Sequence, residues 1–322
     1  MDQENRDGAD EMLSPELLSK IRALRAKYGA TGQDLPAYLE GLFYADYLHY
    51  WDYINLDALL GLQTPRTALP DEMIFIVYHQ TTELYFKLIR QEIDRALALE
   101  APTGAELTEH LTRVNRYFRV LIESFDVMVD GMEPAQFRRF RMALLPASGF
   151  QSVQYRLIEM ASTDLINLVE INARPALADA PPEAQLERVY WRKGASQLAS
   201  GDETLTLRHF EAKYGDELLR AAHRHQISNL RQLYQRVPED DPDREQLIGA
   251  LRRFDYRTNV HWPLIHLRAA GRYLDRHPEV IAATGGTNWQ RYLPPRYQQR
   301  TFFPELWTEE ERGTWGREIL DL

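Results

Sequence analysis

The stretch that decides the fold is Asp71–Leu88, DEMIFIVYHQTTELYFKL. Five residues in and just after this stretch stand three or four positions apart, the spacing of one face of an α-helix: Phe75, His79, Thr82, Phe86 and Ile89. Asp71, just after Pro70, is predicted to cap the helix start, and Glu72 adds a favourable charge there. His79 stands where leucine is usual. It is either a core histidine with hydrogen-bond partners or a proton-handling residue that faces a cavity, and the spacing leaves both interpretations open.

Outward from this stretch, almost every segment after Ser14 has the helical period, and few segments alternate like strands. Residues 1–14 are predicted to be disordered, and 15–322 to form a single all-α domain. Within it, the more polar piece 183–236, between Pro-rich breaks, is predicted to be a smaller helical insert packed on the main bundle. The predicted helices are 15–28, 36–48, 55–62, 71–100, 104–132, 134–144, 149–172, 184–194, 205–235, 243–276 and 308–319.

Composition narrows the class of protein. The 322 residues include 38 Lys+Arg and 48 Asp+Glu, a formal charge of −10, which argues against a nucleic-acid binder. Arg138–Arg141 and Arg252–Arg253 are therefore interpreted as solvated helix faces. The absence of cysteine excludes disulfides, zinc fingers, iron–sulfur ligation and thiolate-bound haem. The acidic start has no signal-peptide pattern, and no apolar run is long enough to span a membrane, so a cytoplasmic protein without a membrane partner is expected.

Helical bundles hold cofactors between facing helices. A carboxylate-bridged di-iron site needs Glu three residues before histidine, and none of the nine histidines has one. Haem held by histidine, tyrosine or methionine stays possible.

Six segments in order carry a resemblance. They are 71–88, YWDYINLDALLGLQ at 50–63, PASGFQSVQYR at 146–156, Trp262 with His266 and Arg272, ATGG at 283–286 and FPELW at 303–307. Together they resemble the tryptophan 2,3-dioxygenase family, haem enzymes that open the indole ring. The matches span 50 to 307, most of the chain.

The resemblance implies roles for the histidines. His266 matches the proximal ligand of haem b iron, with Trp262 one turn earlier as a second cofactor-binding residue. His261 lies on another helix face, and His223 and His225 stand in a charged run typical of a surface. His79 would then face the substrate side and contact the indole N–H, with O2 as co-substrate.

The same resemblance implies a substrate pocket. Phe75 would pack on the indole, although it suits ordinary core nearly as well. Arg156 would hold the substrate carboxylate, since guanidinium offers two parallel donors; the alternative is a surface pair with Glu159. Thr284 would add a hydroxyl, or else belong to a plain turn. Tyr50 and Tyr53 match residues that reach a neighbouring subunit's pocket, which implies a homotetramer, but aromatic residues here also suit a packed core.

Departures from the family pattern leave the reaction open. Pro263 removes a backbone donor near His266 and would start or kink that helix. The loop ATGGTNW, 283–289, differs from the family's GTGGSSG, with Trp289 in place of a glycine. The expected reaction is 2,3-dioxygenation of L-tryptophan, or a close derivative, to N-formylkynurenine. Monooxygenation to a 2-oxindole is the alternative, and a haem-binding sensor without turnover is the alternative of another class.

Overall fold

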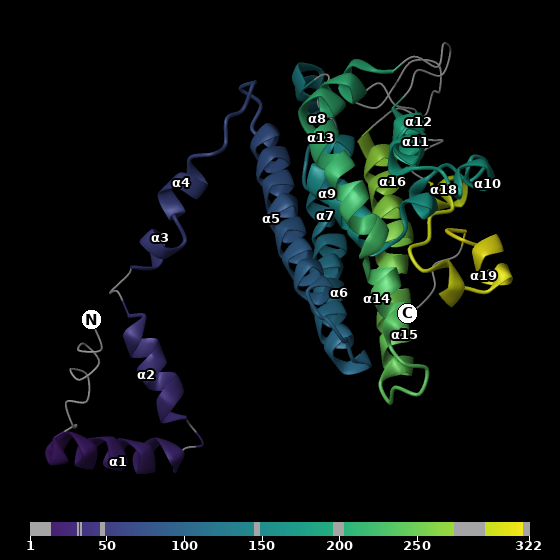
Figure 1. The fold of residues 1–322 in the computed structure, drawn as a ribbon. Coiled ribbons are helices and arrows are strands. Elements are labelled where there is room, and N and C mark those ends of the chain that lie inside the picture. Colours follow the sequence, from purple (N-terminus) through teal and green to yellow (C-terminus); the bar gives the residue numbers. More distant parts are fainter. Residues whose placement is uncertain are drawn as a thin grey trace, which may run out of the picture. The chain divides into compact units, whose positions relative to one another are not determined.

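The computed structural model describes residues 14–30, 32, 34–45, 49–144, 149–195, 203–273 and 294–317. Most of these residues are helical, and a single isolated bridge between Val169 and Val189 is the β-pairing found among them (Figure 1). The all-α class predicted from the sequence is confirmed. No helix of the described part is long and apolar enough to span a membrane.

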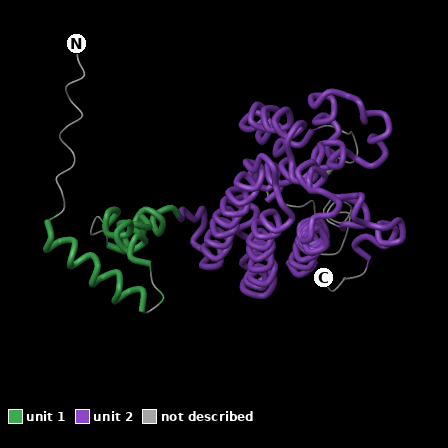
Figure 2. Tube along the Cα trace, turned by 60° about the horizontal axis from the view of Figure 1, so that its bottom comes forward, with its two compact units in different colours: residues 1–62 green, residues 63–322 purple. Residues whose placement is uncertain are grey.

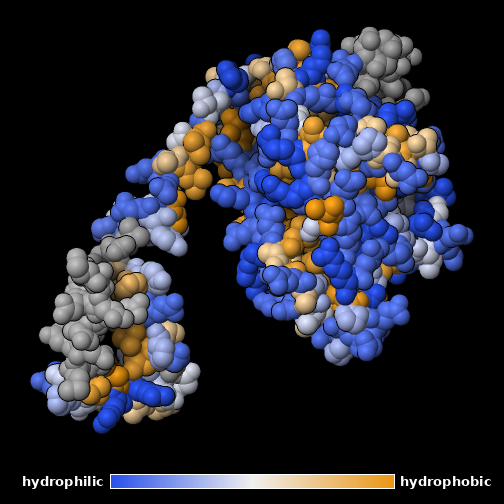
Figure 3. All heavy atoms as spheres, viewed as in Figure 1, coloured by the Kyte–Doolittle hydropathy of each residue, from blue (hydrophilic) through white to orange (hydrophobic). Residues whose placement is uncertain are grey.

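The chain separates into two compact units, residues 1–62 and 63–322 (Figure 2). The first unit carries α1 (Pro15–Gly29), α2 (Leu35–Phe43), α3 (Tyr50–Tyr53) and α4 (Leu56–Leu60). Among its described residues only Leu35 is buried. Apolar side chains stand on its surface instead (Figure 3): Leu42, Phe43, Tyr44, Tyr50, Trp51, Tyr53, Leu60 and Leu62. The first unit therefore buries almost no core of its own among its described residues, and the single domain predicted over 15–322 stays a prediction.

The second unit contains the long helices. Its elements are α5 (Asp71–Leu97), α6 (Gly104–Ser124), α7 (Asp126–Val129), α8 (Pro134–Phe140), η1 (Arg141–Leu144), η2 (Gly149–Gln151), α9 (Val153–Ser162), η3 (Leu165–Leu168), α10 (Arg174–Leu177), α11 (Pro182–Leu186), α12 (Tyr190–Gly194), α13 (Leu205–Ile227), α14 (Leu230–Arg236), α15 (Arg244–Tyr256), η4 (Arg257–His261, a π-helical turn), α16 (Trp262–Tyr273), α18 (Pro295–Gln298), η5 (Pro304–Leu306) and α19 (Glu309–Gly313).

Helix α5 packs on α6 and α9, and α15 packs on α6 (Figure 1). An aromatic series connects the helices through the core. Phe86 lies 6.4 Å between ring centroids from Phe118 and 5.9 Å from Trp262, and Phe118 lies 5.8 Å from Phe254. Phe86, Phe118 and Phe254 are at most 2% exposed. The helical stripe around Phe86 therefore supplies core, and Phe86 packs against Trp262 at the start of α16.

The start of α5 differs from the predicted cap. Asp71 is itself the first helical residue, and its Oδ2 accepts a hydrogen bond from the Glu133 amide at 2.6 Å. Glu72 instead accepts from the amides of Arg66 and Thr67, each at 2.7 Å. Burial alone would raise the pKa of Glu72, but these bonds and one from the Thr67 hydroxyl lower it. Glu72 thus fastens the preceding loop to the helix.

Two predicted helices are interrupted by tertiary hydrogen bonds. The helix predicted over 149–172 ends at Ser162, because Thr163 is extended and donates its hydroxyl to the Phe302 carbonyl. The helix predicted over 205–235 divides at Ser228 and Asn229. The Asn229 side chain caps α14 by accepting from Gln232 N at 3.0 Å. The piece 183–236 is packed on the bundle through α13 and α9, and it belongs to the second unit.

Candidate functional site

His79 projects from the first half of α5, and the helix backbone holds its ring. Its Nδ1 lies 2.7 Å from the carbonyl oxygen of Phe75, one turn earlier. Because a carbonyl only accepts, Nδ1 carries the proton and Nε2 keeps a lone pair. The Phe75 ring lies 4.1 Å from the imidazole centroid. Burial lowers the pKa of His79 more than the Phe75 carbonyl and Glu83 raise it, so the ring is neutral at pH 7.

His266, on α16, is held in the same way. Its Nδ1 lies 2.7 Å from the Trp262 carbonyl, so its Nε2 also keeps a lone pair. Burial lowers the pKa of His266, the Trp262 carbonyl raises it and His79 lowers it, which together give a pKa of about 4. The buried Trp262 ring lies 4.4 Å from the imidazole. A neutral imidazole with a defined lone pair is the form in which histidine binds a metal.

The two imidazoles lie within electrostatic reach of one another, since His79 shifts the pKa of His266. Phe125, between α6 and α7, connects the two sides. Its ring lies 4.4 Å from His266 and 5.5 Å from Tyr78, which neighbours His79. Both histidines are only half-buried, in a region otherwise built from aromatic core. The structure therefore brings together the two residues that the sequence predicted on opposite sides of one site.

The π-helical turn before α16 accommodates Pro263. Trp262 donates its amide to the Arg257 carbonyl, five residues earlier. In that register the next carbonyl, of Thr258, would bond residue 263, and proline has no N–H to offer. The Tyr155 hydroxyl donates to Thr258 O instead, at 3.0 Å. Pro263 therefore lies in the first turn of α16, and a side chain from α9 satisfies the carbonyl that proline cannot reach.

The C-terminal segment supports the same turn through Asp255. One carboxylate oxygen accepts from Phe302 N at 2.9 Å and Asn259 Nδ2 at 2.7 Å. The other accepts from Phe303 N at 3.1 Å and Trp307 Nε1 at 2.9 Å. Burial raises the pKa of Asp255 to about 6, against these four bonds. The FPELW segment is thus hydrogen-bonded to the end of α15. Five residues, 257–261, separate the end of α15 from the start of α16, the helix that carries His266.

An aromatic wall stands beside Phe75. Its ring lies 5.7 Å from Phe140 and 6.1 Å from Phe137, both on α8, and Phe137 lies 4.7 Å from Tyr273 of α16. The wall connects the His79 helix to the His266 helix. An aromatic substrate placed near His79 would therefore meet apolar surface, as its ring requires.

Arg141 follows this wall directly, and the sequence interpretation missed it. Arg138 and Arg139 are exposed as expected, but Arg141 is only 8% exposed. Burial lowers the pKa of its guanidinium. The available signal was its position four residues after Phe137, on the apolar face of the arginine-rich stretch.

Arg156, predicted to hold the substrate carboxylate, lies in a buried charge cluster. Its Nη1 donates to Glu159 Oε2 at 2.7 Å and also contacts the Tyr190 hydroxyl. Arg300 contacts the same carboxylate, and donates to Tyr190 Oη at 2.7 Å. The pair with Glu159, the alternative already open from the sequence, is therefore present, but in the core and not on the surface. Glu159 pairs with the Nη1 atom of Arg156, whereas its buried Nε has no hydrogen-bond partner among the described residues.

The remaining predicted site residues are placed elsewhere. Tyr50 and Tyr53 lie on α3 of the first unit, 70% and 74% exposed. Thr284, together with the whole ATGGTNW loop, lies outside the described residues.

Comparison with known proteins supplies the family. A family model described as tryptophan 2,3-dioxygenase matches residues 41–179. A tryptophan 2,3-dioxygenase of Bradyrhizobium diazoefficiens is 32% identical over 279 residues, 81% of this chain and 91% of that protein. One of Ruegeria pomeroyi is 31% identical over 275 residues, 82% and 92% of the two chains. One of Ruegeria sp. (strain TM1040) is 49% identical over 117 residues, 36% of this chain and 42% of that protein. The chain belongs to the tryptophan 2,3-dioxygenase family.

Proposed function

We propose that this protein is a haem-dependent oxygenase that cleaves the indole ring of L-tryptophan, or a close derivative, by 2,3-dioxygenation. The observation that carries the proposal is the pair of neutral imidazoles, His79 and His266, each with Nε2 free to bind. The family and the tryptophan 2,3-dioxygenases to which the chain is similar support the same reaction.

The donor set fits a haem better than a bare metal ion. Within the described ranges, no group of three or more His, Cys, Asp or Glu side chains is arranged to hold a metal. One imidazole is enough where a porphyrin provides four of the iron's ligands. His266 would be that ligand, because its Nδ1–H is already bonded to the Trp262 carbonyl and its low pKa keeps Nε2 unprotonated. Bound haem b would supply the O2 chemistry.

His79 would orient the substrate. Its Nε2 lone pair can accept a hydrogen bond from the indole N–H, because Nδ1 is occupied by the Phe75 carbonyl. Indole is a very weak acid, so this contact fixes the tilt of the ring and steers proton movement without removing the proton beforehand. Phe75 and the α8 wall would pack on the ring faces.

Arg156 stays a candidate for the substrate carboxylate, and Arg141 is a second. It is a buried cation next to the aromatic wall, whereas Arg156 is bonded to Glu159. Burial destabilises the charged form of Arg141 and lowers its pKa, and a carboxylate beside it would stabilise the charged form again. Thr284 stays a proposal from the family resemblance, as a second contact to the amino-acid end.

Tyr50 and Tyr53 are proposed to act in a neighbouring copy of the chain, within a homotetramer. The first unit displays exposed aromatic and aliphatic side chains and buries almost none among its described residues. Such a surface requires a partner to exclude water from it. Both the tetramer and a cytoplasmic location remain predictions.

The test is to count how many oxygen atoms from labelled O2 enter the product. Turnover of tryptophan and ring-methylated tryptophan under labelled O2, followed by mass spectrometry, should give a product with both atoms of one O2 molecule. One incorporated atom would assign the protein to the 2-oxindole branch. A haem spectrum without tryptophan-dependent O2 uptake would make it a sensor, and a preparation that takes up no haem would remove the proposal altogether.

A further inference from the structure

The π-helical turn Arg257–His261 sets the direction in which α16 continues from α15, and its hydrogen bonds differ from those of an α-helix. In an α-helix the Trp262 amide would bond the Thr258 carbonyl, four residues earlier. Here it bonds the Arg257 carbonyl, five residues earlier. Turns of this kind are rare inside helices and often stand at functional sites. The turn therefore leaves the Thr258 carbonyl without its usual backbone donor.

Tyr155 supplies a donor to this carbonyl from another helix. Its hydroxyl bonds Thr258 O at 3.0 Å, and Thr258 is fully buried, so bulk water cannot take the place of the hydroxyl. Burial raises the pKa of Tyr155 to about 12, so the phenol keeps its proton at pH 7. A buried carbonyl without a donor is costly. Loss of the Tyr155 bond would thus favour return of the Trp262 amide to Thr258, which is the α-helical register.

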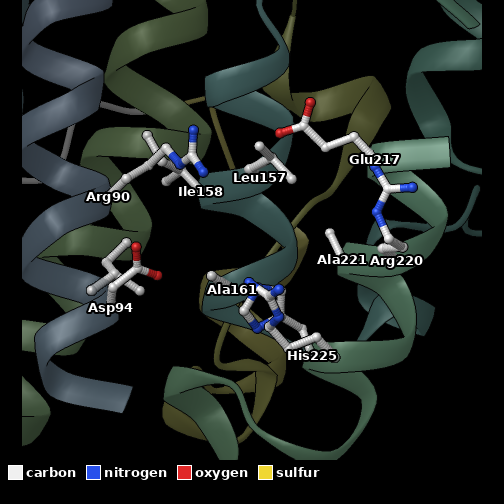
Figure 4. Close-up of a pocket in the computed structure, with 11 residues that line it drawn as sticks. Arg90, Asp94, Leu157, Ile158, Ala161, Glu217, Arg220, Ala221 and His225 are labelled. Carbon is white, nitrogen blue, oxygen red and sulfur yellow. The ribbon is translucent and has the colours of Figure 1, made fainter. Parts of the chain in front are cut away.

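Helix α9 gives Tyr155 a fixed position. In Figure 4 the α9 residues Leu157, Ile158 and Ala161 lie between α5 and α13, and they are at most 7% exposed. The Tyr155 ring also packs on Phe86, with 5.5 Å between the ring centroids. The core therefore holds the ring independently of its hydroxyl, and a variant that lacks only the hydroxyl tests the bond to Thr258.

The turn ends on the residue that holds the His266 ring. Trp262 donates its amide to the turn, and its carbonyl lies 2.7 Å from His266 Nδ1. The two ends of this one residue thus connect the register of the turn to the direction of the imidazole. One residue of α-helix corresponds to about 100° of rotation, so even a fraction of a register change would re-aim His266.

We propose that Tyr155 is a positioning residue for His266 and, through it, for the haem. By bonding the Thr258 carbonyl, it keeps the Trp262 amide in the π-helical register and fixes the direction in which α16 presents the imidazole. Pro263 makes this support necessary, because it has no N–H that could bond the carbonyl instead. The inference rests on the proposed function, since it requires that His266 binds the haem iron.

Tyr155→Phe removes the hydroxyl and keeps the ring. The measurement is the resonance Raman spectrum of the haem-loaded protein, ferrous and without O2, in which the iron–histidine stretching band depends on the orientation of the imidazole. The band should shift or split in Tyr155→Phe. Haem transfer to an excess of a globin acceptor should become about tenfold faster, the effect expected for one lost hydrogen bond.

Tyr78→Phe is the matched control. It also removes a buried tyrosine hydroxyl from a helical carbonyl, that of Leu121 at 3.1 Å, but this bond has no part in the turn. Tyr78→Phe should destabilise the fold in denaturant titrations and leave the iron–histidine band and the haem transfer rate unchanged. In the opposite direction, 4-aminophenylalanine at position 155 keeps a donor at the same place and should restore the wild-type band.

Hydrogen exchange gives a readout that does not depend on iron. In the same preparations, the segment 257–262 should exchange about tenfold faster in Tyr155→Phe than in wild type or Tyr78→Phe. Equal exchange in all three proteins would overturn the proposal.

Three spectroscopic results would also overturn it. They are an unshifted band with unchanged haem transfer in Tyr155→Phe, an equal shift in Tyr78→Phe, and a shift that 4-aminophenylalanine does not reverse. A wild-type protein that takes up no haem would instead remove the proposed function, and it is recognised from the wild-type spectrum alone. The two failures are therefore distinguishable.

Discussion

Replacing Arg141 by methionine separates the two arginines that could hold the substrate. A guanidinium that binds a carboxylate with two charge-assisted hydrogen bonds, at about 1.5 kcal/mol each, contributes about 3 kcal/mol. Arg141→Met should therefore lower kcat/KM for L-tryptophan about a hundredfold, mainly through KM.

Tryptamine provides the control substrate, because it lacks the carboxylate. If Arg141 contacts that group, the loss in kcat/KM between wild type and Arg141→Met should shrink to within about threefold with tryptamine. Steady-state kinetics with both substrates, on protein of matched haem content, give the comparison. An equal loss for both substrates would mean that Arg141 only shapes the pocket.

Arg156→Met is the matched variant and should behave in the opposite way. It leaves buried Glu159 with Arg300 as its remaining cation, a loss on the order of 3 kcal/mol in unfolding free energy. The KM of the folded fraction should stay near that of wild type. A tryptophan-specific rise in KM for Arg156→Met, with none for Arg141→Met, would refute the hypothesis that Arg141 binds the substrate carboxylate.

Three further predictions follow from the site. His266→Ala should abolish haem retention, seen as loss of the Soret band, while the exposed His223→Ala should keep it; normal haem content in the first variant would disprove the ligand assignment. His79→Ala should retain haem but weaken turnover and tryptophan binding, and unchanged kinetics would remove His79 from the substrate pocket. Because burial raises the pKa of Asp255 to about 6 from 3.8, the folded state holds that proton more tightly. The unfolding free energy of wild type relative to Asp255→Asn should thus fall by about 3 kcal/mol between about pH 4 and pH 6.5, in denaturant titrations; parallel curves would refute it.

The local sequence pattern was sufficient to predict the helical class, the long helices and the family. The 3.6-residue period around Phe86 reports which face of α5 is buried, and burial of that face is what stabilises a bundle. The tautomers of His79 and His266 also depend on local geometry, since each Nδ1 bonds the carbonyl four residues earlier. A helix brings those atoms together whatever surrounds it.

Tertiary contacts decided what the pattern left open. Arg156 pairs with Glu159 only three positions later, but whether this pair lies in the core or on the surface depends on residues far away in sequence. Arg300 meets Glu159 across 141 positions. Likewise, the effect of Pro263 depended on Tyr155, 108 positions earlier, whose hydroxyl satisfies the Thr258 carbonyl.

The sequence by itself determined that this chain makes helices, which faces they bury, and that two histidines stand on two such faces. Only the tertiary structure decided that Arg156 pairs with Glu159 beside Arg300 in the core, and that Arg141 is buried beside the aromatic wall. The physical reason is the separation along the chain over which each effect acts. Helix periodicity acts over four residues, whereas desolvation and charge pairing are set by whichever side chains the fold packs together.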